Sequence, residues 1–592
     1  MNKKWKMFKT SFAGFYPFIK PYKWAFLGAI LMIVITVVSM VAAPSIEGLI
    51  TTQLANDVNV SLQSGEAITV NFDKITQIMI ILAGVYLAKT ISQMISIVLL
   101  TNAIQNAMCD LRNAVQNKIR QLPVRYFDTH QYGDVLSRIT NDIDAVSNAL
   151  QQSFTSVVSG VLTILFAMFM MFRLNAMMAC VAIMIIPLSL LITQYIVRHS
   201  QRRFKDQQDA LGTLNGAITE LYTGYNEILL FNKQQDSIEN FRKLNDNLRD
   251  NAFKAQFVSS TIGPLNALVT YLTIGTVAVI GTTKILQGDL SVGNLQAFVR
   301  YIWQINDPLS QISNLSSQIQ SAFAGVGRVL EILAEEEEVA EKNPPERLED
   351  VKGNVSFEHV RFGYGEDDLM KDLNVEVKSG QMVAIVGPTG AGKTTLINLL
   401  LRFYDVKGGS IRIDGVDIRD MKRGELRSLF GMVLQDTWLF SGSIYDNIRY
   451  GRLDARKDEI IEAAKMANVH HFIRTLPDGY HSVINEEANN ISQGEKQLLT
   501  IARAILKDPQ ILILDEATSS VDTRLEKMLQ DAMKNVMQGR TSFVIAHRLS
   551  TIRSADLILV INDGDIVEQG THEELMMIQG YYEKLYNSQF AE

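Results

Sequence analysis

Residues 381–400 read QMVAIVGPTGAGKTTLINLL and decide the fold of the second half of this chain. The run 382–386 is short and apolar, as in a buried strand, and an apolar segment of helical type closes the stretch. Between them, residues 387–394 fit the pattern G-x-x-x-x-G-K-[ST]. A strand, this loop and a helix in that order form the context in which the pattern binds phosphate.

The residue types of this loop suit a nucleoside triphosphate. Glycines let the backbone curl around an anion, so that several N–H groups and the helix N-terminus point at phosphate. The Lys393 ammonium can reach the terminal phosphates, and the Thr394 hydroxyl can ligate Mg²⁺. A chance glycine-rich turn is the alternative, and the later motifs argue against it. The predicted nucleotide-binding residues are Gly387, Pro388, Thr389, Gly390, Ala391, Gly392, Lys393, Thr394 and Thr395.

Composition separates the 592 residues into two regions. A chain of this length exceeds one compact domain. Hydrophobic residues make up 47% of it and charged residues 20%, because long apolar runs fill the part up to about residue 332. The net charge of −7 and the lack of a dense Lys/Arg tract argue against a nucleic-acid partner. Two cysteines, Cys109 and Cys180, argue against a disulfide framework or a Cys-based metal site.

Six apolar segments are candidate transmembrane helices. Residues 24–46 contain no charge and are too long for the core of a signal peptide, whose cleavage would also leave Pro44 directly after the cut. The other candidates are 75–100, 154–172, 177–197, 257–283 and 292–317, of which the last is the weakest by hydropathy. Six spans return the chain to its starting side.

Basic residues beside the spans predict the orientation. Residues 47–73 carry acids and no Lys or Arg, whereas the opposite side holds the amino-terminal lysines together with Arg112, Lys118, Arg120, Arg125, Arg198, Arg202, Arg203 and Lys205. Both termini are therefore predicted to be cytoplasmic, in a multi-pass protein of the cytoplasmic membrane. The two long cytoplasmic connections are rich in helix formers and lack a strand pattern, so we expect helices that project into the cytosol.

The sixth candidate span carries a polar stripe. Alternating spacings of four and three residues place its members on one helical face: Arg300, Gln304, Asp307, Gln311, Asn314 and Gln318. Polar groups at membrane depth are costly unless they face a partner or a wet cavity, so the stripe is a candidate lining of a substrate pathway. The alternative is that Arg300 and Asp307 pair with neighbouring helices to hold the bundle together. Lys89, deep in the second span, allows both interpretations.

A polar stretch separates the two regions. It contains the acidic run 335–338, which we interpret as a solvated face, and the pair Pro344-Pro345. The predicted domains are a transmembrane domain over 1–332, a linker over 333–350 and a nucleotide-binding domain over 351–592. In the last of these, short apolar strands alternate with helical segments, as in a largely parallel α/β sheet.

A second buried-strand run, residues 511–514, ends in Asp515 and Glu516. Acids at the carboxyl end of a strand beside a phosphate loop lie where α/β folds bind ligands. Asp515 is placed to hold Mg²⁺, directly or through water. Glu516 is placed to polarise the attacking water as a general base.

The segment 490–497, NISQGEKQ, resembles the signature segment of ATP-binding cassette (ABC) proteins, usually Leu-Ser-Gly-Gly-Gln. Further matches stand in family order: Tyr364 in VRFGYG, Gln435 in MVLQDTW, Asp522 in SSVD and His547 in VIAHRLST. The resemblance covers essentially the whole chain, and six spans before one nucleotide-binding domain resemble a half-transporter of the ABC exporter class. It implies a membrane all-α domain of six helices followed by an α/β P-loop nucleotide-binding domain.

The resemblance also implies a role for each matched residue. Tyr364 is expected to stack on adenine, His547 to contact the γ-phosphate, and Asp522 to lie at a dimer seam. The expected catalytic residues are Glu516, His547, Lys393 and Gln435, and the expected Mg²⁺ ligands are Thr394, Gln435 and Asp515. The signature residues Ser492, Gln493, Gly494 and Glu495 are expected to face the ATP of the other subunit. By analogy, segments around 128–138 and 224–231 contain coupling helices that dock on the nucleotide domains.

The signature departs from the family pattern. Gln493 replaces a glycine where backbone approaches phosphate, and its side chain obstructs that approach. Glu495 puts a carboxylate near the γ-phosphate, although acids also suit helix N-termini. Residues 485–488 read Asn-Glu-Glu-Ala where the family usually has Gly-Glu-Arg-Gly. Glu516 and His547 are nevertheless present, a combination that resembles one subunit of the heterodimeric ABC exporters.

We therefore expect ATP-driven export of an amphipathic drug-like molecule, lipid or peptide by alternating access. The chain would act with ATP, Mg²⁺ and a second half-transporter in the lipid bilayer, as part of a heterodimer with one competent and one degenerate ATP site. The alternatives are a homodimer with two working sites, an ATP-gated channel or regulator, a soluble-type ABC protein, and an importer of exporter-like fold. Six fused spans argue against the soluble type. The sequence shows no extra regulatory domain of the kind that would favour the ATP-gated channel or regulator.

Overall fold

A computed structural model describes residues 13–65, 67, 69–434, 437–485, 490–515, 523–546 and 548–589 of the chain. Within these ranges, the side chains of 309, 310, 312–317, 320, 523 and 550 are not described. The chain divides into two compact units, residues 1–121 with 130–335, and residues 122–129 with 336–592. Most of the predicted linker therefore packs as part of the carboxyl-terminal unit, and so does the short helix α4, Val124–Thr129.

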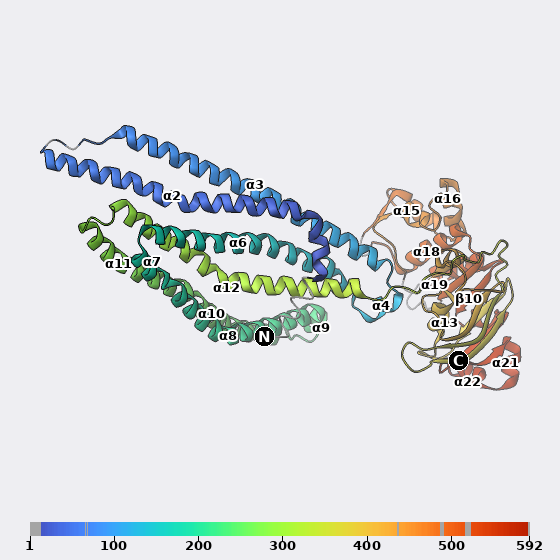
Figure 1. The fold of residues 1–592 in the computed structure, drawn as a ribbon. Coiled ribbons are helices and arrows are strands. Elements are labelled where there is room, and N and C mark those ends of the chain that lie inside the picture. Colours follow the sequence, from blue (N-terminus) through green and yellow to red (C-terminus); the bar gives the residue numbers. More distant parts are fainter. Residues whose placement is uncertain are drawn as a thin grey trace. The chain divides into compact units, whose positions relative to one another are not determined.

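The first unit is a bundle of long helices. Its elements are η1 Lys20–Tyr22, α2 Lys23–Ser64, α3 Phe72–Ile119, α5 Tyr132–Ser137, η2 Arg138–Asp142, α6 Ile143–Leu174, α7 Ala176–Ile183, α8 Ile185–Thr223, α9 Tyr225–Leu230, α10 Gln234–Ser260, α11 Ile262–Leu286 and α12 Val292–Ala334. Among the described residues, five helical stretches are long and apolar enough to cross a membrane: Ala13–Ser64, Phe72–Ile119, Tyr132–Leu174, Ala176–Thr223 and Gln234–Leu286. The polar stripe keeps α12 out of this group, as its low hydropathy predicts. Figure 1 shows α2 and α3 lying side by side along their length.

Two glycines let α2 and α12 approach each other closely. A Cβ added to Gly293 would lie 1.7 Å from the carbonyl oxygen of Gly48, and one added to Gly48 would lie 2.4 Å from the carbonyl oxygen of Gly293. The Thr52 hydroxyl donates to Ser291 Oγ across the same contact, at 3.1 Å. Small residues at a crossing allow backbone contact between helices where lipid supplies no hydrophobic drive.

The carboxyl-terminal end of α12 is held by ion pairs. Arg328 binds Asp142 through two guanidinium nitrogens, at 2.7 and 2.5 Å, and this bidentate geometry fixes α12 against the start of α6. Arg138 joins Asp134, at 3.0 Å, to Glu331 of α12, at 3.2 Å. Asp142 lies in the π-helical turn η2, and such turns often mark functional positions in helices.

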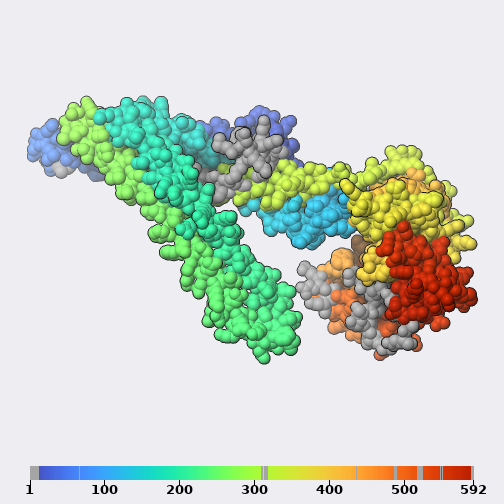
Figure 2. All heavy atoms as spheres, turned by 90° about the horizontal axis from the view of Figure 1, so that it is seen from below, coloured from blue at the N-terminus to red at the C-terminus, as the bar shows by residue number. Residues whose placement is uncertain are grey.

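Helices α8 and α10 pack together as an arm with α9 at its tip. Figure 2 shows this arm, in green, projecting from the other helices of its unit. No residue of α9 is buried, and the exposed side chains at the tip include Tyr225, Leu230 and Phe231. The second long connection is thus helical along this arm, and its expected place in the cytosol stays a prediction.

The described part of the second unit contains three sheets. A six-stranded sheet has the order β12-β11-β3-β10-β9-β6, and all of its pairs are parallel except β11 with β12. Beside it lie a four-stranded antiparallel sheet, β2-β1-β4-β5, and the pair β7-β8. The strands are β1 Val355–Phe362, β2 Met370–Val377, β3 Met382–Val386, β4 Gly408–Ile413, β5 Val416–Asp417, β6 Phe430–Val433, β7 Gly442–Ser443, β8 Val483–Ile484, β9 Ile511–Asp515, β10 Thr541–Ile545, β11 Leu557–Asn562 and β12 Asp565–Gly570. The predicted α/β fold, with a largely parallel sheet, is confirmed.

Helices cover this sheet and bury its apolar strands. The helices of this unit, apart from α4, are α13 Lys393–Leu400, α14 Arg423–Ser428, α15 Ile444–Arg449, α16 Lys457–Met466, α17 His470–Thr475, η3 Gly479–His481, α18 Gln493–Lys507, α19 Thr523–Met537, α20 Leu549–Arg553, α21 His572–Ile578 and α22 Tyr581–Gln589. Two cores result, one on each face of the six-stranded sheet, because Leu512 and Leu514 of β9 belong to one and Ile511 and Ile513 to the other. The sheet thus forms a rigid base whose strand ends carry the candidate site.

Candidate functional site

The phosphate loop connects β3 to α13 in the conformation that its glycines were expected to allow. Gly390 and Gly392 have φ values of +85° and +107°, which are strained for any other residue. A Cβ on Gly387 would lie 2.3 Å from the carbonyl oxygen of Ile561, so this position also has no room for a side chain. Gly392 is the N-cap of α13, so the unpaired N–H groups of that helix start at the loop.

Lys393 lies folded over its own loop. Its ammonium donates to the carbonyl oxygens of Gly387, at 2.8 Å, and Pro388, at 3.0 Å. Burial lowers the pKa of this ammonium, and the Asp515 carboxylate acts in the opposite direction. A triphosphate in the loop would supply better acceptors than two carbonyls, so the lysine is poised to transfer its hydrogen bonds to phosphate.

Asp515 ends β9 at the same edge of the sheet as the loop. Strand β10 lies between β9 and β3, with Ile545 aligned to both Asp515 and Ile385. The Thr394 hydroxyl is carried on the first turn of α13. A hydroxyl and a carboxylate are oxygen donors that fit Mg²⁺, which takes its remaining ligands from phosphate and water. Among the described residues no group of three acidic, His or Cys side chains forms a metal site by itself.

Tyr364 lies beside the start of α13 and is 44% exposed. Its hydroxyl donates to Thr395 Oγ1 at 3.2 Å. The Phe362 and Tyr404 rings pack edge-on against it, each with centroids 5.0 Å away. A fixed aromatic ring with an open face suits the stacking of a base.

Tyr404 is a site residue that the sequence did not identify. Its hydroxyl donates to the Asp128 carboxylate in α4, so it links this short helix to the Tyr364 ring. Burial and the hydrogen bond to Asp128 raise the pKa of the Tyr404 phenol above its usual value. The available signal was the aromatic pair Phe403-Tyr404 directly after the phosphate-loop helix, but no local pattern pointed to its partner.

The altered signature segment caps its own helix. Ser492 is the N-cap of α18, and both its N–H and its hydroxyl donate to the Glu495 carboxylate, at 2.8 and 2.7 Å. This is a capping box, so Glu495 does suit the helix N-terminus. Glu495 also occupies the N–H and the hydroxyl of Ser492, the residue that the resemblance places at the γ-phosphate of the other subunit. Gln493, exposed, reaches Thr437 Oγ1 at 3.5 Å, while Gly494 is buried.

Several predicted residues lie outside the described part of the structure: Gln435, Glu516, Asp522 and His547. In the sequence, Glu516 directly follows β9, and His547 comes two residues after the end of β10. Their predicted roles stay predictions. The residues that the structure brings to one edge of the sheet are the loop, Lys393, Thr394 and Asp515.

The polar stripe of α12 shares one face, as its spacing predicts. Arg300, Asp307 and Gln311 are exposed, whereas the residues Tyr301, Ile302 and Ile305 between them are buried. Two contacts of the stripe are with α2: the Arg300 guanidinium lies 3.9 Å from the Glu47 carboxylate, and Gln304 donates to the carbonyl of Met40, at 3.1 Å. The Glu47 carboxylate also accepts a hydrogen bond from the Tyr86 hydroxyl, at 2.6 Å. The side chain of Asn314 is not among those described, and the buried Gln318 Oε1 has no hydrogen-bond partner in the described part of the chain. Lys89, in α3, is half-buried.

Comparison with known proteins matches both units. The family described as the ABC transporter transmembrane region matches residues 26–309, and the family described as ABC transporter matches residues 370–519. A fatty acid ABC transporter ATP-binding/permease protein of Mycobacterium bovis is 44% identical over 87% of this chain and 81% of its own length. An ATP-dependent lipid A-core flippase of Syntrophus aciditrophicus is 34% identical over 86% of this chain and 84% of its own. The solved structure of a bacterial Atm1-family ABC exporter with ATP bound has a TM-score of 0.73 and 27% identity, over 96% of this chain and 99% of that one.

Proposed function

This chain belongs to the ABC transporter family as a half-transporter of the ATP-driven exporter class, and from that premise we propose that it works in a heterodimer with only one competent ATP site. The substrate that we propose is amphipathic, a drug-like molecule, lipid or peptide. Relatives whose names specify fatty acid or lipid A-core support a lipid-like substrate for this chain.

The contact between Glu495 and Ser492 carries the heterodimer proposal. A competent site needs the Ser492 donors free for the γ-phosphate bound by the other subunit, and here the Glu495 carboxylate takes both. Its negative charge also opposes a phosphate at the same helix end. Glu516 and His547, by contrast, are intact in the sequence. The chain would therefore contribute its phosphate loop, Asp515 and Glu516 to the competent ATP site. Its signature segment would contribute to the degenerate ATP site.

The test compares the loss of Glu516 with the loss of Ser492 in the assembled transporter. We expect ATPase activity to require a second half-transporter. In a homodimer of this chain, each Glu516 would face a signature segment whose Ser492 is held by Glu495, so neither ATP site would be competent. In the assembled pair, Glu516→Gln should reduce ATPase by more than about 100-fold, since a general base is worth that much. Ser492→Ala should reduce it by less than about two-fold, since Ser492 faces the idle site.

The homodimer makes the opposite prediction. There, each working site needs both residues, so Ser492→Ala would be severe and the purified chain alone would hydrolyse ATP well. A replacement that opens the signature, Gln493→Gly with Glu495→Gln, would then raise ATPase, whereas in the heterodimer it should leave the rate within about two-fold. A severe Ser492→Ala phenotype in the pair would overturn the one-site proposal.

We propose that Mg²⁺ binds between Thr394 and Asp515 with ATP. Both side chains supply oxygen ligands at the loop edge of the sheet, and Gln435 would add a third protein ligand. The cation would neutralise charge on the transferred phosphoryl group. The chain's own contribution is to hold the phosphates by Lys393 and the loop amides, and to place Glu516 beside the attacking water.

We propose that the polar face of α12 lines the route of the substrate. The loose pair between Arg300 and Glu47 supports this, because an exposed guanidinium 3.9 Å from its carboxylate can exchange that partner for a polar headgroup. In this assignment α12 is the sixth span, the transmembrane domain ends near residue 332, and both termini lie in the cytoplasm. Uptake of a fluorescent lipid into sealed inside-out vesicles would establish export, and uptake only into right-side-out vesicles would indicate an importer.

A further inference from the structure

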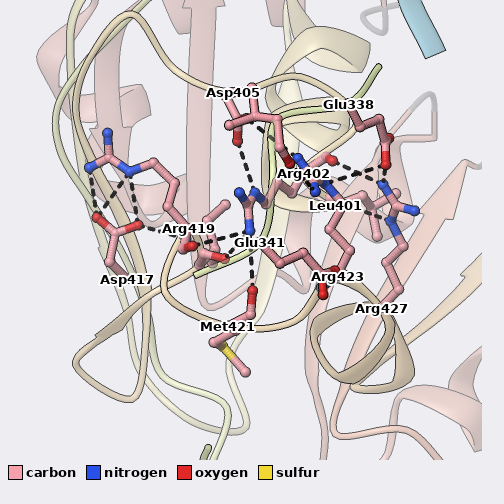
Figure 3. Close-up of polar contacts among 12 residues, drawn as sticks. Glu338, Glu341, Leu401, Arg402, Asp405, Asp417, Arg419, Met421, Arg423 and Arg427 are labelled. Carbon is pink, nitrogen blue, oxygen red and sulfur yellow. Dashed lines mark hydrogen bonds and ion pairs between the residues drawn. The ribbon is translucent and has the colours of Figure 1, made fainter. Parts of the chain in front are cut away.

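The acidic run before the nucleotide-binding domain is only partly solvated. Of its four glutamates, Glu335, Glu336 and Glu337 are exposed, but Glu338 lies against the carboxyl-terminal unit with 26% of its side chain accessible. Its carboxylate is 3.6 Å from Arg423 and 3.8 Å from Arg427, both on α14. Figure 3 shows Glu338 pointing toward these guanidinium groups. The interpretation of residues 335–338 as a solvated face is therefore wrong at Glu338.

The linker beyond Glu338 is fastened to the same helix. Arg423 donates from its guanidinium to the carbonyl of Val339, at 2.8 Å, and from its backbone N–H to the Glu341 carboxylate, at 3.0 Å. Lys342 pairs with Asp420, at 2.9 Å. Because the Arg423 side chain is only 10% exposed, its guanidinium bond to Val339 is shielded from water and stronger than an ordinary surface contact.

Arg427 also holds the chain at the far end of the phosphate-loop helix. Arg427 donates to the carbonyl oxygens of Leu401, at 3.3 Å, and Arg402, at 3.0 Å, the two residues that directly follow α13. Its guanidinium also lies 5.2 Å from the Phe403 ring centre. Arg427 thus bridges a linker carboxylate and the C-terminus of the helix whose N-terminus faces the phosphates.

A buried arginine makes this end of α13 rigid. Arg402 adopts a φ of +52° and its side chain is 3% exposed. It pairs with Asp405, at 2.9 Å, and donates to the carbonyls of Ile418, at 3.1 Å, and Met421, at 3.2 Å. A displacement of the linker at Glu338 would therefore be passed to α13 through connected groups.

We propose that Glu338, Arg423 and Arg427 form a joint by which the linker positions the phosphate-loop helix α13 for ATP. Arg427 is the positioning residue, and Glu338 sets its place from the linker. Since the linker follows α12 in the chain, this joint is the point where a pull from the membrane helices would alter the affinity for phosphate. The inference concerns ATP binding by this chain and does not depend on the heterodimer.

The test measures competition for a fluorescent ATP analogue by ATP and by AMP, with the full-length chain in lipid nanodiscs without Mg²⁺, so that no turnover occurs. Glu338→Gln should weaken ATP binding about three-fold, the scale of a partly exposed ion pair. Its matched control is Glu336→Gln, two residues away, whose exposed carboxylate has no ion pair in the described part of the chain. AMP lacks the β- and γ-phosphates that Lys393 and the loop are expected to hold, so its binding should not change.

A double-mutant cycle tests whether Glu338 and Arg427 affect ATP binding through one shared contact or independently of each other. In an Arg427→Gln background, Glu338→Gln should add less than about 1.5-fold to the loss, because Glu338 acts on α13 through Arg427, whereas its remaining pair is with Arg423. If Arg427→Gln does not fold, Glu338→Lys against Glu336→Lys takes its place, with about ten-fold weaker ATP binding expected only for the former. Equal behaviour of the 336 and 338 variants, or an equal loss of AMP and ATP binding, would overturn the proposal.

Discussion

Tyr404 joins three segments of the carboxyl-terminal unit that are far apart in the sequence. Its hydroxyl binds Asp128, 276 residues away, and its ring supports Tyr364 beside the start of α13. Helix α4, which comes from the connection between the second and third predicted spans, is thereby tied to the ring expected to hold adenine. A single phenol can thus link the docking of α4 to the nucleotide site.

We expect Tyr404→Phe and Tyr404→Ala to separate these two contacts. The phenylalanine keeps the ring and loses one hydrogen bond to a carboxylate, so the unfolding free energy should fall by about 1–2 kcal/mol with ATP affinity changed less than about two-fold. The alanine also removes the support of Tyr364 and should weaken ATP binding several-fold. Thermal unfolding and nucleotide titration of the full chain measure both effects.

Asp128→Asn is the matched control, because it weakens the same bond from the other partner. Combined with Tyr404→Phe it should add no further loss of stability, as expected for two residues that act through one contact. Additive losses in the double variant would mean that Tyr404 and Asp128 act separately.

At the residue scale, the sequence predicted what local chemistry dictates. Gly390 and Gly392 need positive φ, and a loop with that need, placed directly before Lys393 and a helix, is suited to holding an anion. The sequence could not separate Glu338 from the three identical residues before it, because the difference lies in arginines about 85 residues further along. Tyr404 was missed for the same reason.

At the element scale, hydropathy found the apolar parts of helices and missed their extensions. Helix α2 runs to Ser64, well past the predicted end of its span at residue 46, because the helix does not stop where the lipid does. Likewise the 3.6-residue period predicted that the polar stripe shares one face of α12, but it did not predict that this face contacts α2. The close contact of α2 with α12 at Gly48 and Gly293 had no signal in either helix alone.

We expect Gly293→Ala to destabilise the helical unit. The new methyl group would overlap the Gly48 carbonyl, which is backbone and cannot rotate away, so α2 and α12 must separate at a cost of about 1–3 kcal/mol. Thermal unfolding in detergent measures the loss. Gly84→Ala is the control, because that glycine also lies in a long helix, α3, and has nothing within 4 Å of the added Cβ.

That control should be neutral or slightly stabilising, since alanine is the better helix former. A Gly293→Ala protein as stable as Gly84→Ala would mean that the two helices have room to move apart at no cost.

At the scale of the whole molecule, ABC exporters act as dimers, and the arm of this chain presents an exposed apolar tip. Tyr225, Leu230 and Phe231 are 59%, 76% and 70% exposed there, and a cluster of this kind is typical of an interaction surface. A single chain could not reveal its partner's surface, so the sequence indicated a dimer only through the family.

We expect the double replacement of Leu230 and Phe231 by serine to prevent assembly without unfolding the chain. Both side chains are exposed, so the thermal midpoint of the isolated chain should move by less than about 2 °C. The fraction of dimer, measured by light scattering in nanodiscs, and the ATPase rate should both fall at least about ten-fold. Leu286→Ser is the control, an 84% exposed leucine at the end of α11. Loss of assembly by this control as well would show that any exposed leucine in the helical unit matters.

The exposed tip has a consequence for the life of the protein in the cell. Chaperones and proteases act on apolar surface that stays uncovered, and a copy without a partner keeps Leu230 and Phe231 uncovered for as long as it remains single. The arm would then serve as a degradation signal that assembly hides, and the cellular amount of this subunit would follow the synthesis of its partner. Pulse-chase turnover with and without co-expression would measure this dependence directly.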